Sequence, residues 1–109
     1  MAEHRPVPPT RLLKTDVDLF ARKSWLEHYR RKARLVLESY GLSATAIWIT
    51  PSRSKGYHVR IYLDKPVSAR FANMLQWLLL DHCSRVSFND ARIAVGFDEW
   101  NKLFEDPRR

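Results

Sequence analysis

The spacing of apolar positions predicts a long first helix. Between residues 16 and 40, apolar side chains recur every three or four positions, which is the period of one helix face. This stripe comprises Trp25, Leu26, Tyr29, Ala33, Val36, Leu37 and Tyr40. Thr15 is a suitable N-cap, and Asp16 would lie in the first turn, where the helix dipole favours an acid. Gly41 follows at the position where helices commonly end with a left-handed residue, and Leu42 is placed to fold back onto the helix.

The next two apolar runs alternate with a period of two, which is typical of strands. They are residues 43–50, SATAIWIT, and residues 57–63, YHVRIYL. We predict an antiparallel hairpin in which the six residues 51–56 connect the two strands. One face of the hairpin would carry Ile47, Ile49, Tyr57, Val59, Ile61 and Leu63. The second face would carry Ala46, Trp48, Thr50, His58, Arg60 and Tyr62.

A second helix is predicted over residues 68–80, with Ser68 as its N-cap. Its buried stripe would consist of Phe71, Met74, Leu75, Leu78 and Leu79. The last third of the chain is less regular. Residues 84–88, SRVSF, alternate like a strand, whereas residues 91–97 fit either a strand or a short helix that ends at Gly96. Trp100, Leu103 and Phe104 have helical spacing, and we expect them to pack back on the core.

Together these elements predict one small α+β domain, in which an antiparallel hairpin or sheet packs against two main helices. Ferredoxin-like, RRM-like and palm-like folds have this composition. A chain of 109 residues is long enough to bury one core, so we expect a single domain. This domain would span residues 15–105. Residues 1–14 begin with a proline-rich stretch without an apolar period and are expected to form an extended arm, while residues 106–109 should fray.

The charge balance suggests a polyanionic partner. Lys and Arg number 19 against 12 Asp and Glu, which gives a net charge of +7. The single cysteine, Cys83, excludes an internal disulfide and fits a reducing compartment. No secretory signal and no apolar run of membrane-spanning length is visible, so we expect a cytoplasmic protein, in a host cytoplasm if it is viral, with no membrane partner. The adjacent Asp81, His82 and Cys83 do not converge readily on one ion, so neither a metal site nor a cofactor is expected.

The connection between the two strands has the composition of an anion-binding turn. Residues 52–56 read SRSKG: the hydroxyls of Ser52 and Ser54, the charges of Arg53 and Lys55, and the amides around Gly56 could converge on one phosphate. An ordinary polar hairpin turn of the same composition is the alternative.

The second face of the hairpin alternates aromatic side chains with a cation. Such faces form platforms on which nucleic-acid bases stack. The alternative is that both faces of the hairpin are covered, in which case Trp48 and Tyr62 belong to the core.

Gly56-Tyr57-His58 and the strand that follows resemble the small-x-His hairpin in the palm of archaeo-eukaryotic-type primases and their prim-pol relatives. In that family the matching histidine contacts the phosphates of an incoming nucleotide, which implies the same contact for His58. The hairpin is also similar to that of short proteins from phages, plasmids and archaeal viruses. The similarity extends loosely over residues 65–105. In this range the residues that correspond to those of the short proteins are Arg85, Asp90, Arg92 and the pair Leu103-Phe104.

The chain departs from the primase pattern at the metal site. In the family, an Asp-x-Asp pair on the strand before the hairpin loop holds two metal ions, whereas residues 45–50 contain no carboxylate. Asp16 and Asp18 have the required spacing, but the apolar pattern places them in the first turn of a helix. The resemblance therefore implies binding without catalysis, and no catalytic residue is assigned.

We accordingly predict a non-catalytic nucleic-acid-binding protein of a virus or other mobile element. The predicted phosphate and nucleic-acid contacts are Ser52, Arg53, Ser54, Lys55, Gly56, His58, Arg60 and Tyr62. Two alternatives stay open at this stage. The first is a structural or protein-interaction accessory factor that oligomerises, for example as a homodimer, through exposed aromatic side chains. The second is a metal-dependent nuclease or degenerate primase-like enzyme that uses Asp90 and His58.

Overall fold

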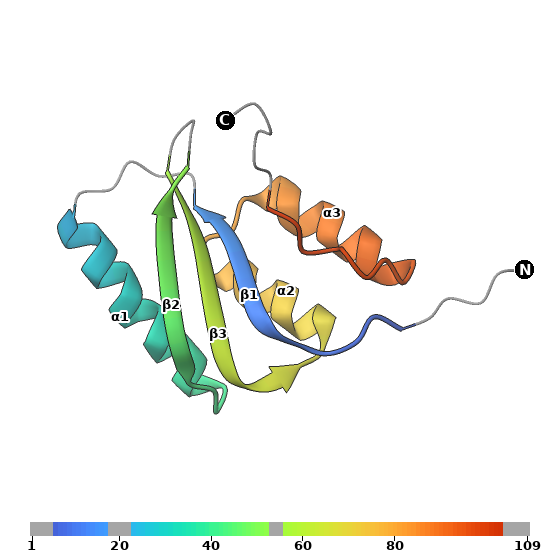
Figure 1. Ribbon diagram of the computed structural model, residues 1–109, viewed down its shortest axis with the longest axis horizontal. Coiled ribbons are helices and arrows are strands. Elements are labelled where there is room, and N and C mark those ends of the chain that lie inside the picture. The colour runs from blue at the N-terminus through green and yellow to red at the C-terminus, as the bar shows by residue number, and fades with distance from the viewer. Residues whose placement is uncertain (1–5, 18–22, 53–55, 104–109) are drawn as a thin grey trace, which may run out of the picture.

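The fold consists of one antiparallel sheet and three helices. The computed structural model describes residues 6–17, 23–52 and 56–103. In chain order the elements are β1 (Thr10–Val17), α1 (Lys23–Ser39), β2 (Ala44–Pro51), β3 (Tyr57–Val67), α2 (Ala69–Leu78) and α3 (Cys83–Ala94). The three strands have the order β1-β3-β2 (Figure 1). This arrangement confirms the predicted small α+β domain.

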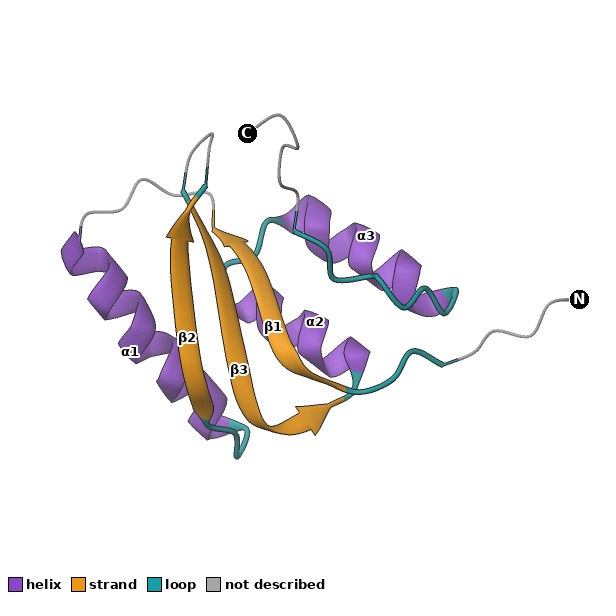
Figure 2. Cartoon of the chain, in the orientation of Figure 1, coloured by secondary structure: helices purple, strands orange, loops and turns teal. Residues whose placement is uncertain are grey.

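Strand β3 lies between the other two strands and pairs antiparallel with both of them. Strands β1 and β2 therefore run in the same direction, and α1 connects them across β3 (Figure 2). The order β1-α1-β2-β3-α2 is that of the first five elements of a split β-α-β, ferredoxin-like chain. Where that arrangement has a fourth strand, this chain continues into α3. None of the helices in the described ranges is long and apolar enough to cross a lipid bilayer.

The core lies between one face of the sheet and the helices α1 and α2, which are drawn behind the sheet in Figure 1. The sheet contributes Leu13, Val17, Ile47, Val59, Ile61 and Leu63, and the helices contribute Tyr29, Ala33, Leu37, Ala72 and Leu75. Trp100 and Leu103 are also buried, which confirms that this segment packs back on the domain. Helix α1 is tied down at two points: the hydroxyl of Tyr29 donates to the carbonyl of Leu79 (2.6 Å), and Nη1 of Arg30 donates to the carbonyl of Ile47 (2.8 Å).

Two predicted helix ends are confirmed in detail. Gly41 has a φ of +72°, and the amide of Leu42 donates to the carbonyl of Leu37 (2.9 Å), which is the bond of a Schellman motif. Leu42 folds back into the core, as predicted. At the start of α2, the side chain of Ser68 accepts a hydrogen bond from the amide of Phe71 (3.2 Å), so Ser68 is the N-cap.

The predicted start of the first helix is wrong. Residues 16 and 17 belong to β1, and α1 begins at Lys23 instead. Thr15 is therefore a buried strand residue rather than a helix cap. The reason is tertiary: every residue from Leu13 to Val17 pairs with a residue of β3, and this pairing outweighs the capping signals of a short polar stretch.

The predictions for the C-terminal third also need correction. The SRVSF stretch, which alternates like a strand, lies within helix α3. In α2, Leu78 is 39% exposed and not part of the buried stripe, whereas the polar Asn73 and Gln76 are buried. Hydrophobic period alone misplaces this part of the helix face, because the neighbouring α3 and the segment after it supply hydrogen-bond partners for the amides of Asn73 and Gln76.

Candidate functional site

The face of the sheet opposite α1 and α2 carries three side chains from each strand, which we call the open face. The register of the sheet aligns them in three rows: Leu12, Tyr62 and Ala46 in the first, Lys14, Arg60 and Trp48 in the second, and Asp16, His58 and Thr50 in the third. Directly opposed residues point to the same side of a sheet. The hairpin part of this face is the second face predicted from the alternation of the two strands.

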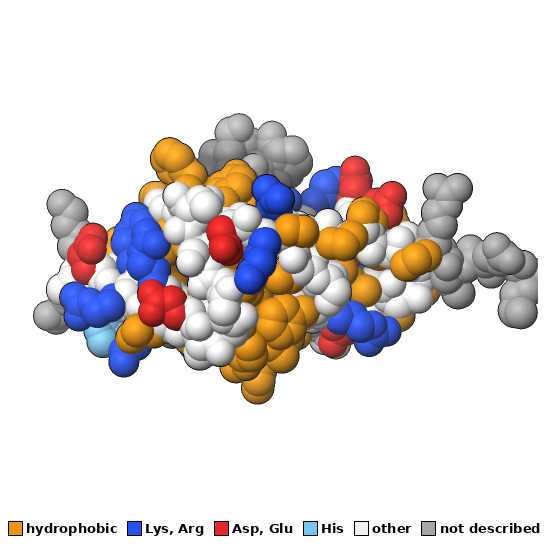
Figure 3. Space-filling view, turned by 90° about the horizontal axis from the view of Figure 1, so that it is seen from below, with side chains coloured by type: hydrophobic (Ala, Val, Ile, Leu, Met, Phe, Trp, Pro, Cys, Tyr) orange, Lys and Arg blue, Asp and Glu red, His pale blue; other side chains and the backbone are white. Residues whose placement is uncertain are grey.

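Two aromatic side chains project from the open face. The side chains of Trp48 and Tyr62 are 62% and 39% exposed, so neither belongs to the core. They stand on neighbouring strands, β2 and β3. On the face shown in Figure 3, exposed apolar side chains lie next to Lys and Arg side chains. The structure thus excludes the alternative in which both faces of the hairpin are covered.

The second row places two cations beside one of these rings. Arg60 lies directly across from Trp48, and Lys14 lies directly across from Arg60 on its other side. Both basic side chains are half-buried at the sheet surface. An aromatic face and two positive charges in one row form a surface that suits a flat, anionic ligand.

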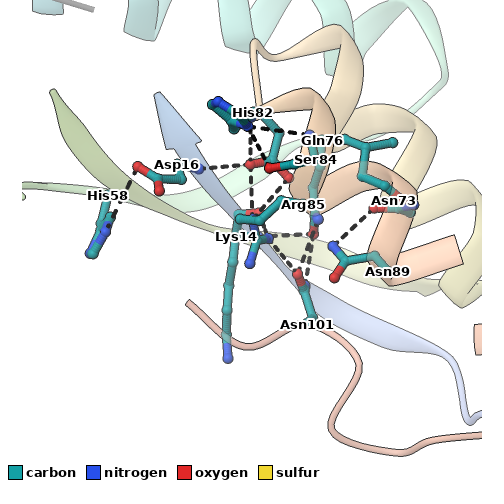
Figure 4. A network of polar contacts seen from close by, with 12 residues as sticks. Lys14, Asp16, His58, Asn73, Gln76, His82, Ser84, Arg85, Asn89 and Asn101 are labelled. Carbon is teal, nitrogen blue, oxygen red and sulfur yellow. Dashed lines mark hydrogen bonds and ion pairs between the residues drawn. The ribbon is translucent and has the colours of Figure 1, made fainter. Parts of the chain in front are cut away.

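The third row is different, because it contains an acid. His58 is buried, with 6% of its surface exposed, and its Nε2 atom lies 3.8 Å from a carboxylate oxygen of Asp16. Figure 4 shows the two side chains facing each other from neighbouring strands. The histidine for which the sequence predicts a phosphate contact is therefore held within the sheet surface beside a carboxylate.

The structure describes the two ends of the turn between β2 and β3, Ser52 and Gly56. The amide of Ser52 donates to the carbonyl of Gly56 (3.0 Å), and Gly56 has a φ of +77°, a value that favours glycine. Arg53, Ser54 and Lys55 lie outside the described residues. Their convergence on a phosphate stays a prediction.

A second group of polar residues closes the outer edge of β1. We call Gln76, Asp81, Arg85 and Asn101 the edge cluster; the first three are buried and Asn101 is half-buried. One carboxylate oxygen of Asp81 accepts from the amide of Asp16 (2.8 Å) and from Nε of Arg85 (3.0 Å). Burial raises the pKa of Asp81, and the hydrogen bonds and charge of Arg85 act against that rise.

The remaining bonds of the edge cluster reach the backbone of β1 and of the segment after α3, residues 95–103, which we call the C-terminal segment (Figure 4). Arg85 donates to the carbonyls of Lys14 (2.8 Å) and Lys102 (2.6 Å). Gln76 accepts from the amide of Lys14 (3.0 Å) and from the side chain of Asn101 (2.7 Å). An edge strand normally exposes such backbone groups to other chains. Here they are bonded to side chains, so the cluster holds β1, α2, α3 and the C-terminal segment together.

The sequence patterns predicted neither the edge cluster nor the β1 part of the open face. The alternation of Leu13, Thr15 and Val17 is a strand signal, but it is short. It lies across the boundary between the predicted arm, residues 1–14, and the predicted first helix. The four-residue spacing of Asp81 and Arg85 is a signal for an ion pair on a helical turn.

Asp90 and His58, the pair on which a nuclease would depend, are held by different partners. The carboxylate of Asp90 accepts from Nδ2 of Asn73 (2.8 Å), whereas His58 lies beside Asp16. Within the described ranges, no group of three or more His, Cys, Asp or Glu side chains is arranged to hold a metal ion.

No protein-family model, curated protein or solved structure matches this chain. The site is therefore interpreted from its own geometry.

Proposed function

We propose that this domain is a non-catalytic nucleic-acid-binding protein whose binding surface is the open face of the sheet. One observation carries the proposal: Trp48 and Tyr62 are exposed beside Arg60 and Lys14 on a face that α1 and α2 leave uncovered. The net charge of +7 supports it, because such an excess attracts polyanions.

The chemistry of each row suggests how the ligand lies. Bases would stack on Trp48 and Tyr62, an interaction worth about 1–3 kcal/mol per base. Phosphates would follow the second row, where Arg60 and Lys14 provide positive charge. Asp16 in the third row would repel a phosphate, which favours the second row as the backbone path. The turn at residues 52–56 belongs to the proposal as a further phosphate contact, on its sequence alone.

Fluorescence anisotropy with labelled oligonucleotides tests the stacking part of the proposal. Trp48→Ala should weaken binding roughly 5- to 150-fold, which corresponds to the loss of one stacked base. Trp77→Ala is the matched control, because Trp77 is 57% exposed but lies on α2, in the helix layer. Equal losses in both variants, or no binding by the unmodified protein at low salt, would contradict the proposal.

The salt dependence of the same titration tests the backbone contacts. Arg60→Ala should reduce the slope of log K against log [salt] by about 0.7, the value for one phosphate contact on a single strand. Arg70→Ala removes the same charge from an exposed position of α2 and should leave the slope closer to that of the unmodified protein. An unchanged slope for Arg60→Ala would remove this residue from the binding surface.

A further inference from the structure

A groove with aromatic walls lies between α3 and the segment that follows it. It has a volume of about 550 Å³, and its lining includes Phe88, Arg92, Phe97 and Lys102. The rings of Phe88 and Phe97 are 62% and 50% exposed. The guanidinium of Arg92 lies 5.6 Å from the centre of the Phe88 ring, which is a cation–π distance. The groove thus combines the same two features as the open face, exposed rings and positive charge.

A second groove joins this one to the open face. It has a volume of about 380 Å³ and lies between the N-terminal end of β1 and residues 98–102. On one side it is lined by Leu12 and Lys14, which belong to the first and second rows of the open face. On the other side it is lined by Glu99 and Lys102, which also line the groove beside α3. The three surfaces thus adjoin one another through shared lining residues, and together we call them the track.

Charge and exposed rings along the track together favour a nucleic-acid strand over a basic or purely apolar segment. The cations Arg60, Lys14, Lys102 and Arg92 follow one another from the open face to the far groove. In the grooves, Lys102 and Glu99 are paired at 3.4 Å and offset each other's charge, and Asp98 lines only the nearer groove. Exposed rings stand at both ends of the track and cations lie between them. A single strand matches this order, because its bases are free to stack while its phosphates pass the cations.

We infer that the ligand is a single strand that runs from the open face across β1 into the groove beside α3, where Phe88 and Phe97 form a second place for base stacking. This inference rests on the proposed function and adds to it the ligand class and the path. In a duplex the bases are already stacked on one another, so a duplex would not use the rings at both ends of the track.

The length of the oligonucleotide separates the two binding places. A thymidine oligonucleotide of about 4 nucleotides can occupy the open face alone, whereas one of about 12 can follow the whole track, given that single-strand sites span about 4–16 nucleotides per small domain. Anisotropy titrations with both lengths should show tighter binding of the longer strand. The double variant Phe88→Ala, Phe97→Ala should weaken binding of the longer strand roughly fivefold or more and leave the shorter one unchanged.

Trp48→Ala should weaken binding of both lengths, because both include the open face. Leu35→Ala is the control, since Leu35 is an exposed apolar residue (52%) on α1, away from the track. Phe88→Leu with Phe97→Leu keeps apolar volume but removes both rings. This variant should behave like the alanine pair, which separates stacking from damage to the fold.

The outcomes distinguish the two claims. If Trp48→Ala weakens binding while both phenylalanine pairs bind the longer strand like the unmodified protein, the track inference is wrong and the proposed function stands. Equal affinity for the longer strand and for a duplex of the same length would also overturn the inference. Binding of the duplex alone would likewise overturn the inference and leave the proposed function standing. If neither single strand nor the duplex binds at low salt, the proposed function itself fails.

Discussion

The edge cluster and the open face both adjoin β1, and they use their side chains in opposite ways. In the edge cluster, the hydrogen-bonding atoms of Asp81, Arg85 and Gln76 are bonded to other parts of the chain. On the open face, the rings of Trp48 and Tyr62 are left exposed to solvent.

Lys14 belongs to the open face and is also bonded to the edge cluster, which makes the contrast clear. Its backbone amide and carbonyl are bonded by Gln76 and Arg85 of the edge cluster, while its side chain stands in the second row of the open face. Because a strand directs its edge groups sideways and its side chains to the faces, one residue can serve both. We therefore expect the edge cluster to determine stability and the open face to be available for binding.

The largest effect is expected from Arg85→Ala. Removing this arginine leaves the carboxylate of Asp81 buried without its counterion and frees the carbonyls of Lys14 and Lys102. The free energy of unfolding should fall by about 3–5 kcal/mol, as measured by urea denaturation. Arg70→Ala, at an exposed position, should change it by less than about 0.5 kcal/mol. A loss below about 1 kcal/mol for Arg85→Ala would show that the edge cluster does not govern stability.

The second-largest effect is expected from Tyr29, a buried residue whose contribution to stability should depend on alkaline pH. Burial raises the pKa of Tyr29 from 10.0 to about 12, and its hydroxyl donates to the carbonyl of Leu79. The folded protein therefore keeps the phenol neutral where the unfolded chain ionises. The resulting stability is fully present below pH 10 and should be lost between about pH 10 and 12, up to about 2.7 kcal/mol.

Tyr29→Phe supplies the control for this pH dependence. Unfolding free energies of both proteins should be measured from pH 9 upward, and the difference between them reports Tyr29 alone, since the lysines titrate in both. If the difference between the two proteins stays constant across this range, the expectation for Tyr29 is refuted.

A smaller effect, of opposite sign, is expected at Leu80. This residue has a φ of +71°, and the next residue is Asp81, so a strained backbone leads directly into the edge cluster. Leu80→Gly should raise the free energy of unfolding by about 1 kcal/mol, because the left-handed conformation is unfavourable for leucine and not for glycine. Leu78→Gly, at the last residue of α2, should instead lower it. Thermal unfolding of the two variants in parallel checks the sign.

The smallest effect on stability is expected from Trp48→Ala, although this change should weaken binding most clearly. The side chain is 62% exposed, so its removal should change the free energy of unfolding by less than about 1 kcal/mol. Urea denaturation and oligonucleotide binding should be measured on one preparation of this variant, to test directly whether Trp48 contributes to binding but not to stability. A large loss of stability would mean that Trp48 serves the fold as much as the binding surface.

Local sequence patterns were sufficient to predict the hairpin, the faces of its two strands, the second helix and two helix ends. Each depends on local rules: the period of two in residues 57–63, the left-handed glycine at position 41 and the serine cap at position 68. The aromatic and basic residues of the hairpin's second face could be named for the same reason, since alternation alone assigns them to one side.

The other features of the fold and of the site depend on tertiary contacts. Strand β1 exists because β3 pairs with it, and the short SRVSF stretch is helical within α3, which packs against α2. Whether the second face of the hairpin is open depends on where α1 and α2 pack, which no local pattern specifies. The edge cluster brings Gln76, Asp81, Arg85 and Asn101 to the backbone of Lys14, and this meeting depends on the complete fold. Contacts between distant residues give little signal along a single sequence, because their free energy appears only when the chain has closed on itself.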